Sequence, residues 1–302
     1  MKIMSRISGR FLLAFFILYA IGPWAYIQDA LAQNEKSFIW RVEAEGSTVY
    51  ILGSIHFLKK ESYPLPPKIE KAFEEADTLV VEANINDEGK INPSIIMERA
   101  FYPENDTLPS HVSKETYGRI REEAGGLGIP PEQMDRCRPW FLAITISSLE
   151  FMKMGYDPRY GIDYYFLTKA ANLKKILELE SLDYQIRLLS SLSDTEQELF
   201  LLHTLKDLKI ADQEFNQLFN AWTSGDCQGM ESIMMKYTKE DSRLSGAYEK
   251  LIYERNKSMA GKIETYLKTK GTYFVVIGAA HLIGDKGIVE ILRGKGYRVV
   301  QF

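Results

Sequence analysis

The chain of 302 residues has little cysteine, little histidine and no strong excess of charge of either sign. Cys137 and Cys227 are the only cysteines, which excludes a thiolate zinc site of the Cys-x-x-Cys type. The sequence leaves open whether they form one disulfide or are two unrelated thiols. A formal net charge of −4 gives no basic surface, so we expect no nucleic-acid partner.

Motifs of nucleophilic catalysis are also missing. The chain has no Gly-x-Ser-x-Gly elbow, and Ser54 in "GSIH" is a weak nucleophile candidate beside His56. Neither cysteine has a histidine near it in sequence. After Gln33 no apolar run reaches the ~20 residues that a membrane span needs.

The first residues have the pattern of a cleavable signal peptide. Basic residues within 2–10 precede an apolar run at 11–22, and small residues follow at 30–32. We therefore expect residues 1–32 to be removed and the mature protein to be exported, to a bacterial periplasm. The alternative is an uncleaved segment that anchors the protein to the membrane.

Residues 33–302 are predicted to form one α/β domain with a central mixed sheet. Strands from both ends of the chain build this sheet and enclose a long helical insertion at about 132–270, which forms a lid or subdomain. A hairpin is expected at Glu45-Gly46. The order strand, helix, strand predicts a crossover with parallel pairing between residues 48–54 and 78–85. The strand-like runs are 37–44, 48–54, 78–85, 174–181, 272–279 and 297–302.

A repeated motif, Gly-x-x-His, follows two of these apolar runs. It occurs at Gly53 to His56 and again at Gly278 to His281. Glycine is about 7% of average sequence, so two of four histidines rarely share this spacing by chance. Carboxyl ends of parallel strands are where ligands bind, and glycine there permits a sharp turn or a close approach. We therefore expect both imidazoles at one edge of the sheet.

Two carboxylates occupy equivalent places. Glu82 ends one strand and Glu180 ends or follows another. Imidazole and carboxylate together suit a divalent transition metal with an open position for water, and hydrolysis is the natural reaction class. The alternatives are hydrogen-bonded loop histidines, Glu82 as a helix cap or ion-pair partner, and Glu180 as a cap of the next helix.

Arg255 and Asn256 lie on the helix before the second motif. The arginine is a candidate to stabilise an oxyanion and the asparagine to orient a ligand or a water. A surface arginine paired with Glu254 is the alternative. Asp163 is by default an acid in the first turn of a helix.

These residues carry a resemblance to a known family. The chain is similar to the TraB/PrgY/GumN family, whose animal relatives are the Tiki proteases. The similarity takes in nearly all of the mature chain, and its stretches are Val49–Asn86, Gly161–Gln185, Glu254–Ala260 and Val276–Phe302.

The resemblance implies a metal-dependent hydrolase with a Tiki-like, erythromycin-esterase-like α/β fold. It implies manganese or cobalt as the metal, with zinc as a further option. PrgY-type members are linked to reduced activity of a peptide pheromone and GumN is named after a polysaccharide gene cluster, so the family leaves the substrate open. Carried over by position, the metal ligands are His56, His281 and Glu82, the catalytic residues are Glu82, Arg255 and Glu180, and the supporting residues are Gly53, Gly278, Asn256 and Asp163.

The sequence thus predicts an exported metallopeptidase acting on a peptide or protein. Glu180 or Glu82 would be the general base, and Arg255 would stabilise the developing oxyanion. One alternative is a protein that sequesters a peptide or metal without turnover, and another is an esterase for a small molecule. The sequence does not determine the oligomeric state.

Overall fold

A computed structural model describes residues 36–302 apart from 88–91, 209 and 237–240. The predicted signal peptide, residues 1–32, lies outside this part of the chain. None of the helices in the described ranges is both long and apolar enough to cross a membrane.

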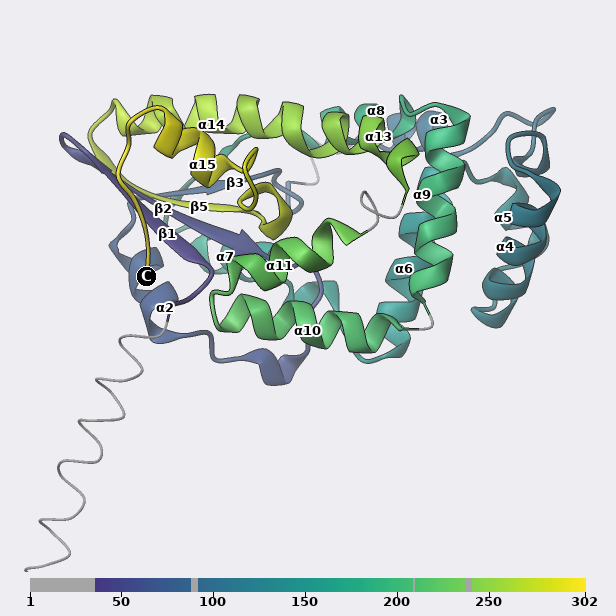
Figure 1. The fold of residues 1–302 in the computed structure, drawn as a ribbon, viewed down its shortest axis with the longest axis horizontal. Helices are drawn as coiled ribbons and strands as arrows, with labels where there is room; N and C mark the ends of the chain where they lie inside the picture. Colours follow the sequence, from purple (N-terminus) through teal and green to yellow (C-terminus); the bar gives the residue numbers. More distant parts are fainter. Residues whose placement is uncertain (1–35, 88–91, 209, 237–240) are drawn as a thin grey trace, which may run out of the picture.

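A mixed sheet of six strands forms the centre of the fold, in the order β4-β3-β5-β2-β1-β6 (Figure 1). β1 is antiparallel to β2 and β6, whereas β2, β5, β3 and β4 run parallel. Strands from both ends of the chain share this sheet, as the sequence predicted. Their bounds are β1 (Ile39–Ala44), β2 (Ser47–Ser54), β3 (Thr78–Val81), β4 (Lys175–Glu178), β5 (Gly271–Gly278) and β6 (Val299–Gln301).

The β1–β2 hairpin confirms the predicted turn, and Gly46 adopts the left-handed φ of 80° that it requires. The predicted pairing of β2 with β3 is wrong. The two strands are parallel, and α2 (Pro67–Glu75) connects them, but β5 lies between them and pairs with both. The local sequence pattern predicts a crossover connection, but it does not show that a distant strand lies between the two connected strands.

Helices cover both faces of the sheet. α14 (Glu254–Leu267) and α15 (Ile288–Gly294) lie on one face, and α2 and α7 (Ile162–Ala170) lie on the other (Figure 1). Under α2 and α7, the rings of Phe73, Phe166 and Phe274 pack with centroids 4.8 to 5.5 Å apart. This buried layer fixes α7 against the middle of the sheet.

The helical part begins earlier than expected, at Pro93 instead of about residue 132. The strand predicted within it at 174–181 is β4. α9 starts at a capping box in which Ser193 and Glu196 bond each other's backbone N–H. Besides short 3-10 helices, the described ranges also contain α3 (Pro93–Ala100), α4 (Lys114–Gly126), α5 (Pro131–Arg136), α6 (Pro139–Lys153), α8 (Leu182–Ser190), α9 (Asp194–Asp207), α10 (Ala211–Thr223), α11 (Cys227–Met234), α13 (Ser245–Tyr248) and the π-helix η6 (Glu249–Tyr253).

Two separate hydrophobic cores result. The main core lies around the sheet, and a smaller one joins α4, α5, α6 and α9. Cys137 is buried in the smaller core, whereas Cys227 packs against the main one, and both are free thiols.

Candidate active site

The two Gly-x-x-His motifs meet at one edge of the sheet. β2 and β5 are parallel neighbours, with Ser54 opposite Gly278, so both motifs leave the sheet at its carboxyl end. His56 follows β2 by two residues, and His281 closes the short helix η7 (Ala279–His281). In Figure 1 the β2 arrow ends toward α11 and the helical part of the molecule.

His281 is buried, with 4% of its surface exposed, and its tautomer is fixed. The side-chain amide of Asn256 donates to the Lys286 carbonyl at 2.9 Å, so its oxygen is left to accept from His281 Nδ1 at 2.6 Å. His281 Nε2 then carries a lone pair and lies 3.9 Å from Glu82 Oε1. Burial lowers the pKa of His281 to about 4, so the ring is neutral near pH 7.

Arg255 joins the two predicted carboxylates in a buried network. Its Nε and Nη2 bond Glu180 at 2.8 to 3.1 Å, and Nη2 also bonds Glu82. Its Nη1 donates to the Leu251 carbonyl at 2.8 Å. Burial by itself would lower the pKa of Arg255, but the bonds to Glu180 and Glu82 outweigh it and raise that pKa. Arg255 is therefore charged and buried, which excludes the alternative of a surface arginine paired with Glu254.

Glu82 is held on several sides. Its Oε1 accepts from Gln185 at 2.8 Å, and its Oε2 accepts from the Gly278 backbone N–H at 3.0 Å. Burial by itself would raise the pKa of Glu82, but cationic His281, the Arg255 guanidinium and this N–H hold it well below its usual range. Because His281 is itself neutral near pH 7, the charges that hold the pKa of Glu82 down there are the Arg255 guanidinium and protonated His56. Glu82 is accordingly an ionised carboxylate, the form that binds metals.

Sequence reasoning missed Gln185. Its amide bonds both carboxylates, at 2.8 Å to Glu82 and 3.3 Å to Glu180. A signal was available, because Gln185 ends one of the stretches that resemble the family. Ser181, and not Glu180, caps the following helix α8.

His56 lies in a different environment. Its side chain is 66% exposed, and its Nδ1 lies 2.8 Å from Asp163 Oδ2. Asp163 is in the first turn of α7, whose Ile162 N–H bonds the Ile55 carbonyl beside the motif. The Asp163 carboxylate raises the pKa of His56 to about 9. With Nδ1 on Asp163, Nε2 is the atom left for a ligand.

The two motif glycines lack a side chain for different structural reasons. A Cβ on Gly53 would lie 2.4 Å from the Phe38 ring, so a side chain there would displace part of the core. The Gly53 carbonyl also accepts from Trp222 Nε1 at 2.6 Å. Gly278 instead presents its backbone to Glu82, and a Cβ there would lie 3.4 Å from Glu82 Oε2.

The donor chemistry at this edge suits a divalent cation. Each histidine has its Nδ1 held by a side-chain oxygen, the arrangement that orients imidazoles for metal binding. His281 Nε2 lies 3.9 Å from Glu82 Oε1, which also accepts from Gln185 and Arg255, and a cation between the two atoms would be bound by one imidazole nitrogen and one carboxylate oxygen. Within the described ranges, no three His, Cys, Asp or Glu side chains are already close enough to ligate one ion. A metal would therefore need His56 or Glu82 to move.

Comparison with known proteins identifies the family. Residues 38–301 match the TraB/PrgY/gumN family. The chain belongs to this family. The match takes in both Gly-x-x-His motifs and the helices between them.

Its relatives include uncharacterized and named proteins. "Uncharacterized protein YbaP" of Escherichia coli (strain K12) is 27% identical over 81% of this chain and 87% of its own length. "Metalloprotease TIKI homolog" of Amphimedon queenslandica is 23% identical over 88% of this chain, and "Metalloprotease TIKI1" of Danio rerio is 21% identical over 87%. The chain spans 61% and 63% of these two Tiki proteins. No solved structure matches the chain.

Proposed function

We propose that this protein is an exported, metal-dependent hydrolase that cleaves peptide bonds in a peptide or protein. The observation that carries the proposal is the pair of facing acceptors, His281 Nε2 and Glu82 Oε1, in a buried setting with fixed tautomer and charge. The kinship with Tiki metalloproteases supports the same reaction class.

His56, His281 and Glu82 would hold the cation, manganese or cobalt by the family resemblance and zinc as a further option. When bound, such a cation polarises a carbonyl and lowers the pKa of a coordinated water. Because His56 has a raised pKa, it must lose its proton to become a ligand, and binding would release that proton.

The other residues have separate tasks. Glu180 or Glu82 would accept a proton from the attacking water. Arg255 is already bonded to both carboxylates, so we assign it first to positioning them and second to the oxyanion. Asn256 and Asp163 orient the two rings, and Gly278 orients Glu82.

Export remains part of the proposal and rests on residues 1–32 alone. Periplasmic fractionation of a tagged chain, with amino-terminal sequencing of the product, tests it. A mature protein that begins near Gln33 supports export with cleavage, whereas an intact terminus in the membrane fraction supports the anchored alternative.

Chelation and reconstitution test the activity. The purified protein is treated with chelator, reloaded with manganese or cobalt, and incubated with unstructured peptides, whose cleavage is followed by mass spectrometry. We expect activity only after reloading, and a loss of at least about a hundredfold in His281→Ala and Glu82→Gln, the magnitude typical of removed catalytic groups. Metal binding, measured by calorimetry, should weaken in both.

His111→Asn is the matched control, because His111 lies in the smaller core region and not at the sheet edge. Cleavage that persists without metal contradicts the proposal. Stoichiometric capture of peptide with no product would instead favour the sequestering alternative.

A further inference from the structure

A cavity of about 380 Å³ lies in the helical part of the molecule, between α9, α10, α11, α13 and η6. A volume of this size lies within the usual range for small-ligand pockets. Its walls are mainly apolar and include Phe200, Ile233, Met234, Leu244, Leu251 and Ile252.

One lining residue, Leu251, connects the cavity to the candidate active site. Leu251 lines it, and the Leu251 carbonyl accepts from Arg255, which bonds both carboxylates. Both α11 and η6 also contact η7, the short helix that ends at His281. The π-helical turn therefore faces the cavity with side chains and the catalytic network with a carbonyl, and π-helical turns often occur at functional sites.

The charges at the cavity wall are balanced. Glu214 pairs with Lys236 at 2.6 Å, and His203 Nε2 lies 3.8 Å from Asp241. Each acid thus has a base beside it, so a charged ligand would gain little from entering. The lining favours an uncharged apolar group.

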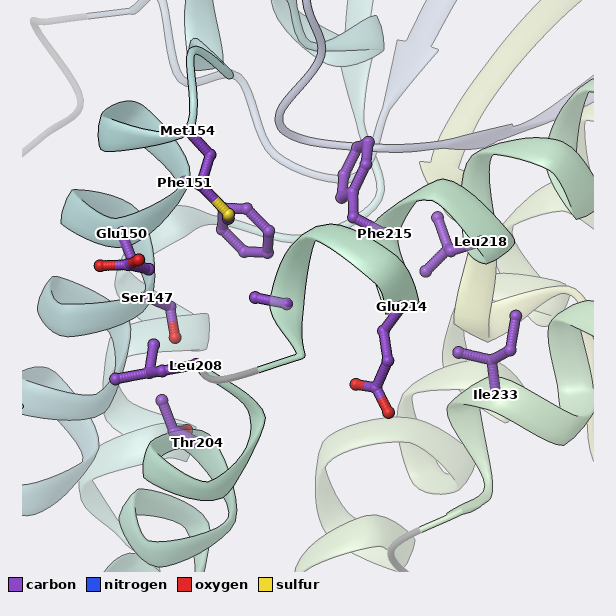
Figure 2. Close-up of a pocket in the computed structure, with 11 residues that line it drawn as sticks. Ser147, Glu150, Phe151, Met154, Thr204, Leu208, Glu214, Phe215, Leu218 and Ile233 are labelled. Carbon is purple, nitrogen blue, oxygen red and sulfur yellow. The ribbon is translucent and has the colours of Figure 1, made fainter.

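A neighbouring cavity provides a comparison. It measures about 230 Å³, shares Thr204, Glu214 and Ile233 with the first, and is lined by Phe151 and other residues of α6, α9, α10 and α11 and their connections (Figure 2). In Figure 2 its side chains converge from the α6 side and from α10. Its lining residues do not come from η6 or η7, so it lacks the connection to Arg255 and His281.

We propose that the 380 Å³ cavity binds a large apolar side chain of the substrate, next to the bond that is cleaved. This specificity pocket rests on the proposed peptidase function. It selects peptides with a leucine-sized or aromatic residue at one position near the scissile bond, because burial of such a side chain in the apolar lining supplies binding energy that serine or aspartate cannot.

The test uses pairs of unstructured peptides that differ at one position, leucine against serine, scanned along the peptide. The loaded wild-type protein should prefer the leucine peptide at one position by about tenfold or more in kcat/KM. Ala247→Leu, which fills the cavity, should bring that preference close to one. Ile252→Ala, which enlarges it, should shift the preference from leucine to tryptophan, and this opposite change guards against misfolding of the filled variant.

Ala211→Leu is the matched control, because Ala211 lines the neighbouring cavity. Peptide affinity of His281→Ala, measured by fluorescence anisotropy, tests binding in the pocket without cleavage. Selective binding that Ala247→Leu removes, with no cleavage by any loaded protein, would support the pocket and contradict the hydrolase. If cleavage and binding show no preference for leucine, or if Ala211→Leu changes the preference as much as Ala247→Leu, the pocket proposal is contradicted. The hydrolase proposal is not affected by that result.

Discussion

The two Gly-x-x-His motifs have the same spacing, yet their histidines occupy opposite environments. His281 is 4% exposed, bonds a neutral amide and has a lowered pKa. The His56 side chain is 66% exposed, bonds a carboxylate and has a raised pKa. The motif therefore fixes where each ring leaves the sheet, whereas the surroundings fix its charge, namely burial at His281 and the Asp163 carboxylate at His56.

This asymmetry suggests that the two histidines have different roles in binding a cation. The buried half around His281, with Arg255 and the two carboxylates, is held by hydrogen bonds and is neutral at the ring. The exposed half around His56 is open to solvent. A cation would bind first where the ligands are already deprotonated and be completed by His56.

The largest effect should come from breaking the buried half at Arg255. Arg255→Met leaves Glu82 and Glu180 buried without their cation, and we expect the free energy of unfolding in urea to fall by about 3–5 kcal/mol. Arg159→Met is the control, because Arg159 pairs with Asp157 in a 76% exposed position and its loss should change little. Equal decreases in the free energy of unfolding in the two variants would show that the buried network does not stabilise the fold more than an exposed ion pair does.

Replacing the partner of His281 should have the next largest effect. Asn256→Ala leaves the buried Nδ1–H without its acceptor, at a cost of about 1–3 kcal/mol. Asn256→Asp retains an acceptor but makes it a carboxylate, as at His56, so it should raise the pKa of His281. Proton NMR of the chelated protein measures the pKa, and an unchanged value in Asn256→Asp would break the comparison.

A smaller effect is expected at the exposed half. Asp163→Asn should lower the pKa of His56 from about 9 toward its ordinary value near 6.5. Because the folded pKa is raised, the pair stabilises the fold below the ordinary pKa and loses this contribution as pH rises through about 9. NMR titration of the chelated protein measures the shift. An unchanged pKa of His56 in Asp163→Asn would contradict the assignment of the raised pKa to the Asp163 carboxylate.

His111 gives the smallest effect and an internal reference outside the site. Its two ring nitrogens lie 2.8 Å from Asp106 and 2.9 Å from Asp194, and its ring stacks on Tyr102, beside Arg138. Partial burial by itself would lower the pKa of His111, but the bonds to Asp194 and Asp106 raise it.

This cluster should therefore stabilise the smaller core region below the ordinary histidine pKa, and the contribution should be lost as pH rises through the raised value. Hydrogen exchange of α4 and α9 in wild type and His111→Gln, at about pH 6 and pH 9, measures it. A difference between the two proteins that grows with pH would contradict this sign.

Much of the sheet was predictable from the sequence, because apolar strands and Gly46 specify local geometry. The predicted strands match β1 to β6. The insertion of β5 between β2 and β3 was not predictable, because that pairing joins residues about 200 positions apart with no local signal.

The site followed the same division. The repeated motif was enough to place His56 and His281 at one sheet edge, since parallel neighbours end together. The network of Gln185, Leu251 and Arg255 could not be predicted from the motif. A buried ion pair and a π-helical turn depend on how α8 and α14 pack over the strand ends. Sequence alone left Arg255 on the surface as one alternative, and packing decides it.

The most direct measurement is X-ray absorption of the cobalt-loaded protein, which counts imidazole ligands on the ion. We expect two imidazoles in the wild type, one in His56→Ala and one in His281→Ala, with no change in His111→Asn. An imidazole count that is the same in the wild type and in either site variant would contradict the claim that both motifs serve one cation.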